Sequence, residues 1–571
     1  MLKESQLQIL KEIVGQEWVN SDPCMMDTYS YYMNPEILNE DGSLWLPRPE
    51  AVVMPSSTEE VSEIMKLANS ENIMVKPLST GWSATAASSR PGVIILDLKR
   101  MDRIIDIDTK NRIAVVEPYV KAIILQTMLW KEGLNLHVVS CGGNHSPLAS
   151  ATSAWGTGLD GPSMSYSGRN LLGAEWVLPT GEVLRLGSAG SEAGWFSADG
   201  PGPSLRGIMR GYTGAFGGLG VFTKAALKLY SWHGPAEIET GGASPHYTVK
   251  DLPPNLGLFM LNFPDEKALA DAGYLLGEAE ITYADFRLPP FMTALGATDT
   301  NLELKRVWES GLFQKTARWN LIAAVMGSSM REYEWKTKAL RQILKEVRGV
   351  RLPLNMDTSE KAVVMAGKLT RFIFDPLKLL RLFPFLTDWI ERLPVNEAGR
   401  KRAVSSLFWV LLRHANNVQG NFRPSQAMFT SMGGFDTWDM GLRQSDWLAG
   451  KKEEYIREGL FLDDGGDLGC GGTFEHSHLG YMEGIGLYTT KEPESVLAAG
   501  KVIDEAVDAC ISEAFGTPIA GFGMRMNQRL GPHCGDYQKW MARLKAALDP
   551  NCAADPFFYS EPEAGDDPDE L

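Results

Sequence analysis

Cysteine is scarce in this 571-residue chain, and the six cysteines that it has lie far apart. They form no CxxC pair and stand at Cys24, Cys141, Cys470, Cys510, Cys534 and Cys552. This spacing argues against a zinc ribbon, an iron–sulfur cluster of the usual kind or a disulfide framework. We therefore expect a protein of the reducing cytoplasm.

Positive charge is also in short supply. The chain has 55 Lys and Arg against 71 Asp and Glu, which gives a formal net charge of -16. Nucleic-acid phosphates are bound by clustered Lys and Arg, which this chain does not concentrate. We expect no nucleic-acid partner. Part of the acidic excess lies in the last stretch, SEPEAGDDPDEL, which we expect to be a solvated tail.

Long apolar runs without charge are missing. The first stretch, MLKESQLQILKEIVG, has an amphipathic helix pattern and none of the features of a secretory or transit signal, so we expect the mature chain to start near Met1. The most apolar segment, residues 369–393, contains charges and two prolines and does not fit a transmembrane helix. Its basic and aromatic residues leave two alternatives, peripheral membrane contact or a buried helix pair between domains.

The chain is too long for one hydrophobic core, and its texture changes along the sequence. Residues 45–232 alternate short β-branched runs with Gly-rich loops, and Ser57 precedes Glu60 at the spacing of a capping box. From about residue 240 to 500 the strand and helix units are longer. We predict an α+β fold with four parts: an N-terminal helical segment (1–44), a first domain (45–238), a second domain (239–514) and a C-terminal segment (515–571) that returns to the first domain.

Small and hydroxyl residues gather in three loops of the predicted first domain. The first loop, KPLSTGWSATA (76–86), has a proline, a glycine and several hydroxyls. Backbone N–H groups in a turn that glycine permits, with Ser and Thr hydroxyls as further donors, hold a diphosphate without a lysine. Alone, this loop fits a surface turn better. Two further loops, at 140–161 and 211–223, favour an elongated cofactor that lies across the domain.

Several stretches then resemble one known family. PLSTG (77–81), VIILDLKRMDRIIDID (93–108) and AVVEP (114–118) are similar to the FAD-binding domain of the vanillyl-alcohol oxidase and p-cresol methylhydroxylase flavoproteins. They also resemble the D-lactate and glycolate dehydrogenase relatives of that family. Residues 168–187 and 214–230 resemble the same domain, and 544–559 resembles its C-terminal return. The resemblance implies an FAD-linked oxidase fold, with a PCMH-type FAD-binding domain of two α/β subdomains and a sheet-and-helix cap domain for the substrate.

The resemblance implies FAD as cofactor and a set of residues that bind it. These are Pro77, Ser79, Thr80, Gly81, Trp82, Ser83, Gly142, Gly143, Ser146, Ser150, Thr152, Gly156, Gly220 and Val221. Some family members attach FAD through a histidine in the first loop, where this chain offers Trp82 and no histidine. We therefore expect dissociable FAD. His414 leaves an attachment from the second domain open.

The stretch CGGTFEHSHLGYMEG (470–484) supplies three candidates for substrate chemistry, His476, His478 and Tyr481. If the stretch is one strand, His476 and His478 share a face. A hydroxyl proton must leave as hydride goes to flavin N5, and histidine suits that role at neutral pH. The metal-binding histidines of the D-lactate and glycolate relatives are matched only in part, so we predict no metal site. A polar strand that faces solvent is the remaining alternative.

A fourth candidate is Arg525. It lies in GFGMRMNQRLG (521–531), which resembles the stretch whose arginine holds a phenolate in the phenol-oxidising branch of the family. Met524 stands where that branch has a tyrosine, which argues against a simple para-alkylphenol as the substrate. Arg525 either holds a carboxylate, phenolate or enolate or is a structural ion-pair partner.

Together these resemblances imply an FAD-dependent oxidoreductase. It would oxidise an alcohol, a hydroxy acid or a benzylic carbon of an anionic or aromatic small molecule, by hydride transfer to flavin N5. One alternative is a D-2-hydroxy-acid dehydrogenase that passes electrons to a protein or a quinone. Another is a non-catalytic flavoprotein subunit or electron-transfer scaffold. The electron acceptor stays open among oxygen, a cytochrome, an electron-transferring flavoprotein and a quinone, and we expect a homo-oligomer, most simply a homodimer.

Overall fold

The structure is a computed structural model, and part of the chain is placed well enough to describe. Ser83, His414, His478 and the segment 369–393 lie outside that part, as does the side chain of Arg525. The described residues are 2–30, 45–82, 88–140, 142–154, 156–188, 194–195, 204–209, 214–242, 248–250, 252–296, 298, 300–311, 313–314, 317–353, 405, 408–413, 427–467, 469–477, 479–518, 524–555 and 559.

In the first sheet the two longer strands, β3 and β4, are parallel. Strand β4 is buried along its whole length, as expected for a parallel strand that is covered on both faces. Helix α4 (Thr58–Glu71) joins β2 to β3, and the Ser57 hydroxyl accepts from the Glu60 nitrogen, which confirms the predicted cap. The strand order is β1-β2-β4-β3, with bounds β1 (Val19–Asn20), β2 (Val52–Val53), β3 (Met74–Leu78) and β4 (Val93–Asp97).

The N-terminal segment joins this first sheet and does not stand apart from it. Strand β1 pairs with β2 through Val19 and Val53. Helix α1 (Glu4–Val14) packs its buried face, which includes Leu10, into the same hydrophobic core as α4. A second short helix, α2 (Pro23–Ser30), follows.

The second sheet is antiparallel and completes the first domain. Its strand order is β5-β6-β10-β8-β9, and Trp176 of β8 stacks on Phe222 of β10 at 5.0 Å between ring centroids. Helix α5 (Ala122–Lys131) buries Leu125 and Leu129 in the core below this sheet. The strand bounds are β5 (Ile104–Asp108), β6 (Ile113–Val116), β8 (Leu171–Val177), β9 (Val183–Leu186) and β10 (Val221–Lys228).

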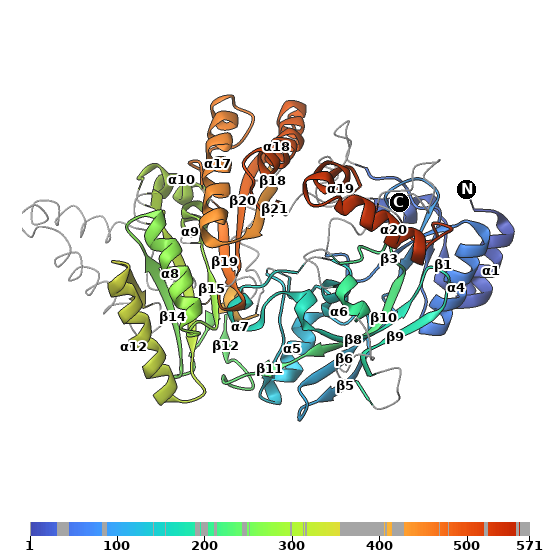
Figure 1. The fold of residues 1–571 in the computed structure, drawn as a ribbon, viewed down its shortest axis with the longest axis horizontal. Helices are drawn as coiled ribbons and strands as arrows, with labels where there is room; N and C mark the ends of the chain where they lie inside the picture. The colour runs from blue at the N-terminus through green and yellow to red at the C-terminus, as the bar shows by residue number, and fades with distance from the viewer. Residues whose placement is uncertain are drawn as a thin grey trace, which may run out of the picture.

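The second domain contains two four-stranded antiparallel sheets (Figure 1). One has the order β15-β16-β14-β17 and carries helices α8 (Glu266–Glu278) and α12 (Met330–Glu346). The other has the order β19-β20-β18-β21 and carries α17 (Trp438–Arg457) and α18 (Pro493–Ser512). The strand bounds are β14 (Leu256–Asn262), β15 (Ala284–Phe286), β16 (Asn320–Met326), β17 (Val350–Pro353), β18 (Ala427–Asp436), β19 (Cys470–Phe474), β20 (Leu479–Thr489) and β21 (Thr517–Pro518).

Shorter elements connect these layers. Two small sheets pair β7 with β11 and β12 with β13. The bounds are β7 (Leu134–Asn135), β11 (Tyr230–Ser231), β12 (Thr240–Gly241), β13 (Thr248–Val249), α6 (Pro147–Thr152), α7 (Gly161–Met164), α9 (Pro290–Gly296), α10 (Asn301–Glu309), α19 (Met524–Leu530) and α20 (Tyr537–Leu548).

The C-terminal segment packs on the first domain (Figure 1). Val75 of β3 forms a parallel bridge with Ala554. The buried ammonium of Lys545 on α20 donates to the carbonyls of Gly218 and Ala554, at 2.7 and 2.9 Å. The last segment therefore contributes to the wall behind β3, while the predicted domain boundaries themselves stay predictions.

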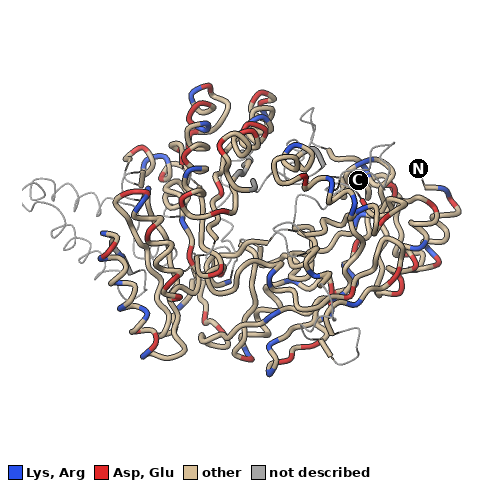
Figure 2. The backbone as a smooth tube through the Cα atoms, in the orientation of Figure 1, with Lys and Arg blue, Asp and Glu red and all other residues tan. Residues whose placement is uncertain are grey.

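Charged residues are concentrated on the outer helices. Figure 2 shows Lys, Arg, Asp and Glu along α12, α17 and α18, with few along the strands between them. No helix in the described ranges combines the length and the apolar character that crossing a bilayer requires.

Candidate functional site

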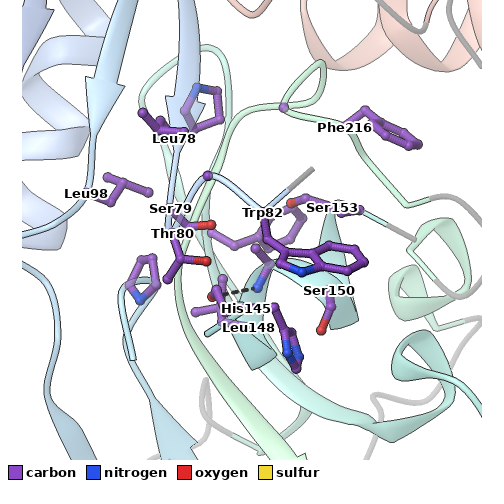
Figure 3. Close-up of a pocket in the computed structure, with 18 of the residues that line it drawn as sticks. Leu78, Ser79, Thr80, Trp82, Leu98, His145, Leu148, Ser150, Ser153 and Phe216 are labelled. Atoms are coloured by element: carbon purple, nitrogen blue, oxygen red, sulfur yellow. Dashed lines mark hydrogen bonds between the residues drawn. The ribbon is translucent and has the colours of Figure 1, made fainter. Parts of the chain in front are cut away.

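A cavity lies where strand β3 ends, between the first loop and helix α6 (Figure 3). Its empty volume is about 720 Å³, including the space at its open mouth. The predicted cofactor residues that line it are Pro77, Ser79, Thr80, Gly81, Trp82, Ser146 and Ser150.

The first loop forms one wall of the cavity. Figure 3 shows Ser79 and Thr80 next to each other on this wall. Gly81 has a φ of +72°, a conformation that glycine adopts at little cost and other residues avoid. A Cβ on Gly81 would meet nothing closer than Leu78, at 3.7 Å, so the backbone angle and not crowding calls for glycine. The loop thus combines a left-handed turn with two hydroxyls, as a diphosphate cradle requires.

Trp82 stands in the cavity beside His145. Their ring centroids are 6.4 Å apart, in an edge-on arrangement (Figure 3). The Nδ1 atom of His145 lies 2.6 Å from the Gly142 carbonyl oxygen. A Cβ on Gly142 would lie only 3.0 Å from the Trp82 indole nitrogen. Gly142 therefore makes room for Trp82, which in turn lines the cavity.

Helix α6 forms the opposite wall. The Ser146 hydroxyl caps this short helix by accepting from the Ala149 nitrogen at 3.1 Å. Ser150 lines the cavity, and its hydroxyl donates to the Pro147 carbonyl at 3.2 Å. Thr152 is buried, and its hydroxyl donates to the Leu148 carbonyl within the helix. Two of the three predicted residues on α6 and its cap therefore border the cavity.

Several predicted cofactor residues lie behind the cavity wall. Gly142, Gly143, Thr152, Gly156, Gly220 and Val221 are outside its lining. A Cβ on Gly156 would overlap the side chain of Ser167, and one on Gly220 would overlap the Val177 carbonyl. Val221 is buried and pairs with Val177 in the second sheet. These positions support the walls, and their contact with the cofactor stays a prediction.

The other lining residues were not among the predicted cofactor ligands, but most of them lie in the three loops at 76–86, 140–161 and 211–223. The lining also includes Lys76, Leu78, Leu98, Pro118, His145, Leu148, Ala149, Ser153, Ala154, Phe216, Gly217 and Phe222. Phe216 and Gly217 belong to the loop at 211–223, which the sequence singled out as a whole. The apolar lining residues can pack against a ring system, and the Ser and Thr hydroxyls can donate hydrogen bonds to a diphosphate. The residues present therefore fit FAD.

A second cluster lies in the second domain, on the face of strand β20 that points away from helix α17. Tyr481 and Glu483 share that face, and the Tyr481 hydroxyl donates to the Glu483 carboxylate. Met482, on the other face, packs against α17 beside Trp438 and Leu442. The alternation of the strand thus sends Tyr481 and Glu483 away from the covering helix.

Aromatic side chains connect this face to the first domain. Tyr166 follows α7 and lies in one cluster with Phe435, Phe474 and Tyr481 of the second domain. The ring centroids are 6.3 Å apart for Tyr166 and Phe435, and 5.6 Å apart for Phe435 and Tyr481. Tyr481 is therefore buried where the two domains meet.

Residues 470–484 do not form one strand, so the condition for His476 and His478 to share a face is not met. Strand β19 ends at Phe474 and β20 begins at Leu479, and the two pair as a hairpin. Between them Glu475, His476 and Ser477 all have positive φ, at 45°, 58° and 65°. His476 therefore lies in a turn and not on a strand. The side chain of His476 is exposed at this turn, and its catalytic role stays a prediction.

Tertiary contacts explain the turn. The Ser477 hydroxyl donates to the Gly273 carbonyl of α8, and a Cβ on Gly277 would overlap Ser477. On the other side, Glu475 accepts from the Ser165 hydroxyl at 2.8 Å and pairs with Arg169 at 3.3 Å. The hairpin end is thus held between a helix of the second domain and the first domain.

The remaining candidates are placed only in part. Arg525 lies in helix α19, but its side chain is outside the described part. His478 is outside it altogether, so its role and that of Arg525 stay predictions. Among the residues that the structure places, no three or more His, Cys, Asp or Glu are grouped to hold a metal ion.

Residues 49–187, which include the first loop and helix α6, match the FAD binding domain family. The chain therefore carries an FAD-binding domain, and FAD is its cofactor, as the sequence predicted. The whole fold resembles a solved p-cresol methylhydroxylase with substrate bound, at a TM-score of 0.67 and 20% identity, over 96% of this chain and 94% of that one. The predicted two-domain α+β fold and the family resemblance are confirmed.

Curated relatives match over shorter stretches. An uncharacterized FAD-linked oxidoreductase of Mycobacterium tuberculosis is 30% identical over 163 residues, which is 27% of this chain and 34% of that protein. A glycolate oxidase subunit of Bacillus subtilis is 24% identical over 237 residues, 40% of this chain and 45% of that protein. The chain thus spans less than half the length of these relatives.

Proposed function

We propose that the protein is an FAD-dependent oxidoreductase that oxidises an alcohol, a hydroxy acid or a benzylic carbon of a small molecule. The observation that carries the proposal is the pairing of an FAD-binding domain with a second domain that presents Tyr481 and Glu483 at the domain junction. When bound, FAD supplies the acceptor for two electrons and the carbon-bound hydrogen of the substrate. The residues of the chain have to orient the substrate and accept its hydroxyl proton.

Tyr481 and Glu483 are suited to accept the proton that the substrate hydroxyl releases. Oxidation of a C–OH group releases the hydroxyl proton, and a nearby protein group must receive it. The Tyr481 hydroxyl already donates its proton to the Glu483 carboxylate, so its oxygen lone pairs can accept a hydrogen bond from the substrate. The proton of the substrate then passes to the Tyr481 oxygen as the tyrosine proton moves to Glu483. Glu483, which the sequence did not single out, thereby becomes part of the proposed site.

The aromatic residues at this junction support an aromatic substrate. Tyr166, Phe435 and Phe474 surround Tyr481 with aromatic surface, which favours an aromatic substrate. Arg525 remains our candidate for holding an anionic group of the substrate. The similarity to a glycolate oxidase subunit over 40% of this chain supports the second candidate, a D-2-hydroxy-acid dehydrogenase that passes electrons to a protein or a quinone.

We also propose a cytoplasmic homo-oligomer. The low cysteine content supports a reducing compartment, and sedimentation of the purified protein tests the oligomeric state. The electron acceptor is best found by offering oxygen, a cytochrome, an electron-transferring flavoprotein and a quinone analogue to the substrate-reduced protein. Reoxidation by oxygen at a rate that matches turnover identifies an oxidase, and reoxidation by one of the others identifies a dehydrogenase.

A panel of anaerobic substrates tests the proposed function. The panel should contain aromatic alcohols, alkylphenols with bulky or anionic substituents, and D-2-hydroxy acids. Loss of the oxidised flavin absorbance with one class supports the oxidoreductase and names its substrate. Failure of the whole panel, with dithionite still reducing the flavin, supports the non-catalytic subunit instead.

A further inference from the structure

Lys76 is a buried lysine in the wall of the FAD cavity. It lies in strand β3, two residues before that strand ends, and its side chain is 2% exposed. Its ammonium donates to the Phe216 carbonyl at 3.0 Å. Phe216 and Gly217 line the cavity together with Lys76. The lysine therefore connects strand β3 with the loop at 211–223.

The cavity wall is otherwise uncharged apart from a histidine. Of the described residues that line it, none is Asp, Glu or Arg, and Lys76 is the single lysine. FAD brings a diphosphate with negative charge into this space. In a site of low dielectric, one nearby cation contributes far more to anion binding than it would in water. Lys76 is thus the one lysine or arginine in the described lining, and in its protonated form it can offset part of the charge of the diphosphate.

Behind Lys76 lies a balanced group of buried charges. Asp555 and Lys545 both act on the Lys76 ammonium, and Lys545 is paired with Asp549. Two lysines and two aspartates therefore face one another at the junction of β3 and the C-terminal segment. Lys545 and Asp549 pair with each other, so Asp555 is the negative charge in this group that acts on Lys76 in the absence of the cofactor.

We propose that Lys76 is the cationic anchor for the diphosphate of FAD. The hydroxyls of Ser79 and Thr80 and the turn at Gly81 supply directed donors, and Lys76 supplies the charge. Burial lowers the pKa of Lys76, while Asp555 opposes that shift. A bound anion favours the protonated form further. Lys76 is the first residue of the stretch 76–86 and belongs to strand β3, so this cation comes from the strand part of the stretch and not from its turn.

The competing explanation is that Lys76 is purely structural. In that case its bond to Phe216 and its neighbour Asp555 only hold the cavity wall together. The two explanations differ in which part of the cofactor binds more weakly when the charge is removed. An anchor for the diphosphate affects ligands that contain a diphosphate, whereas a structural lysine affects every ligand of the cavity to the same degree.

The test uses variants of the full chain loaded with FAD. K76Q removes the charge and keeps a donor for the Phe216 carbonyl, K76M removes both, and K76R keeps the charge. K99M is the matched control, because Lys99 is half-exposed and pairs with Asp97 outside the cavity lining. FAD release on dilution gives its dissociation constant from flavin fluorescence. Displacement of FAD by ADP, and separately by riboflavin, measures the diphosphate and the ring contributions.

An anchor predicts a split between these two competitors. In K76Q the dissociation constant for FAD rises by about tenfold or more, and ADP loses potency by a similar factor, as expected for loss of a charge-assisted hydrogen bond. Riboflavin keeps its potency, K76R recovers part of the FAD affinity, and K99M behaves like the unaltered protein. Equal weakening of FAD and riboflavin in K76Q, or unchanged FAD affinity, overturns the proposal. These are binding readouts, so a missing substrate in the oxidation panel leaves them intact.

Discussion

Asp285 accepts two hydrogen bonds from Thr473, one from its backbone nitrogen at 2.9 Å and one from its hydroxyl at 2.6 Å. Asp285 belongs to β15 and Thr473 to β19, so this contact ties the two sheets of the second domain together. The Asp285 nitrogen also donates to the Leu159 carbonyl of the first domain, at 3.0 Å. One buried carboxyl thus sits at the meeting point of three layers.

The first prediction concerns the pH dependence of stability. Burial raises the pKa of Asp285 from 3.8 to about 6. The folded state therefore binds this proton more tightly than the unfolded state, and the contribution of Asp285 to the free energy of unfolding falls as pH rises from about 4 to about 6. The loss should be at most about 3 kcal/mol. Urea unfolding across this pH range measures it.

D285N carries no titrating group at this position. We expect its free energy of unfolding to change less than that of the unaltered protein between about pH 4 and pH 6. D271N serves as control, because Asp271 is half-exposed and pairs with Lys267 on α8. A constant difference between D285N and the unaltered protein over the whole range would show that Asp285 does not titrate there.

The second prediction tests the proton path. Y481F removes the hydroxyl that we assign to the substrate proton, and we expect flavin reduction by substrate to slow by about 10²-fold, the usual size of a general acid–base contribution. E483Q should slow it by a smaller factor. FAD content should stay unchanged in both variants. Stopped-flow absorbance of the flavin measures the rate.

Y488F is the matched control for Y481F. Tyr488 lies on the same strand but on the opposite face, buried in the core with α18. Its substitution should leave the reduction rate within about twofold of the unaltered protein, since it lies away from the substrate face. A normal rate in Y481F would remove Tyr481 from the mechanism.

The third prediction is that FAD dissociates from the protein. The first loop presents Trp82 in the cavity where some family members have an attaching histidine. Acid precipitation should therefore leave the yellow colour in the supernatant. Colour in the pellet would show a covalent bond, and peptide mapping would then locate it, with His414 and His478 as the first residues to inspect.

The fourth prediction concerns the left-handed turn at His476. Gly277 of α8 has no side chain, and a Cβ there would overlap Ser477 and the His476 carbonyl. G277A should lower the free energy of unfolding by about 1–3 kcal/mol, the usual cost of overpacking. Thermal and urea unfolding of the purified variants measure the change.

G450A shows what the same substitution does in open space. Gly450 lies inside helix α17, and a Cβ there would meet nothing within 4 Å. Alanine is the better helix former, so this variant should gain about 1 kcal/mol. Equal effects of the two substitutions would mean that the contact between α8 and the turn contributes little to stability.

Local signals in the sequence predicted most of the first domain. The Ser57 cap, the apolar run of β4 and the Gly-permissive first loop each depend on neighbours within a few residues. The cavity residues of the first loop and of α6 were predicted from the resemblance of these stretches to a known family. Lys76 was missed, because a lysine in a strand reads as a surface residue until the Phe216 carbonyl, 140 residues away, is known to accept from it.

The second domain was harder to predict in detail. The turn at 475–477 depends on Gly273 and Gly277, about 200 residues earlier in the chain, and nothing within its own stretch required left-handed backbone. The aromatic cluster likewise joins Tyr166 to residues beyond 430. Contacts over such separations carry no local pattern. Glu483 was passed over for the same reason, since its partnership with Tyr481 depends on which face of β20 meets the first domain.

Anaerobic reduction of the bound flavin by substrate tests the central claim most directly. We predict that an aromatic alcohol, a substituted alkylphenol or a D-2-hydroxy acid abolishes the oxidised flavin absorbance without any added reductant, and that Y481F slows this change while Y488F does not. If the flavin stays oxidised with every member of the panel, while dithionite still reduces it, the proposed oxidoreductase activity is contradicted.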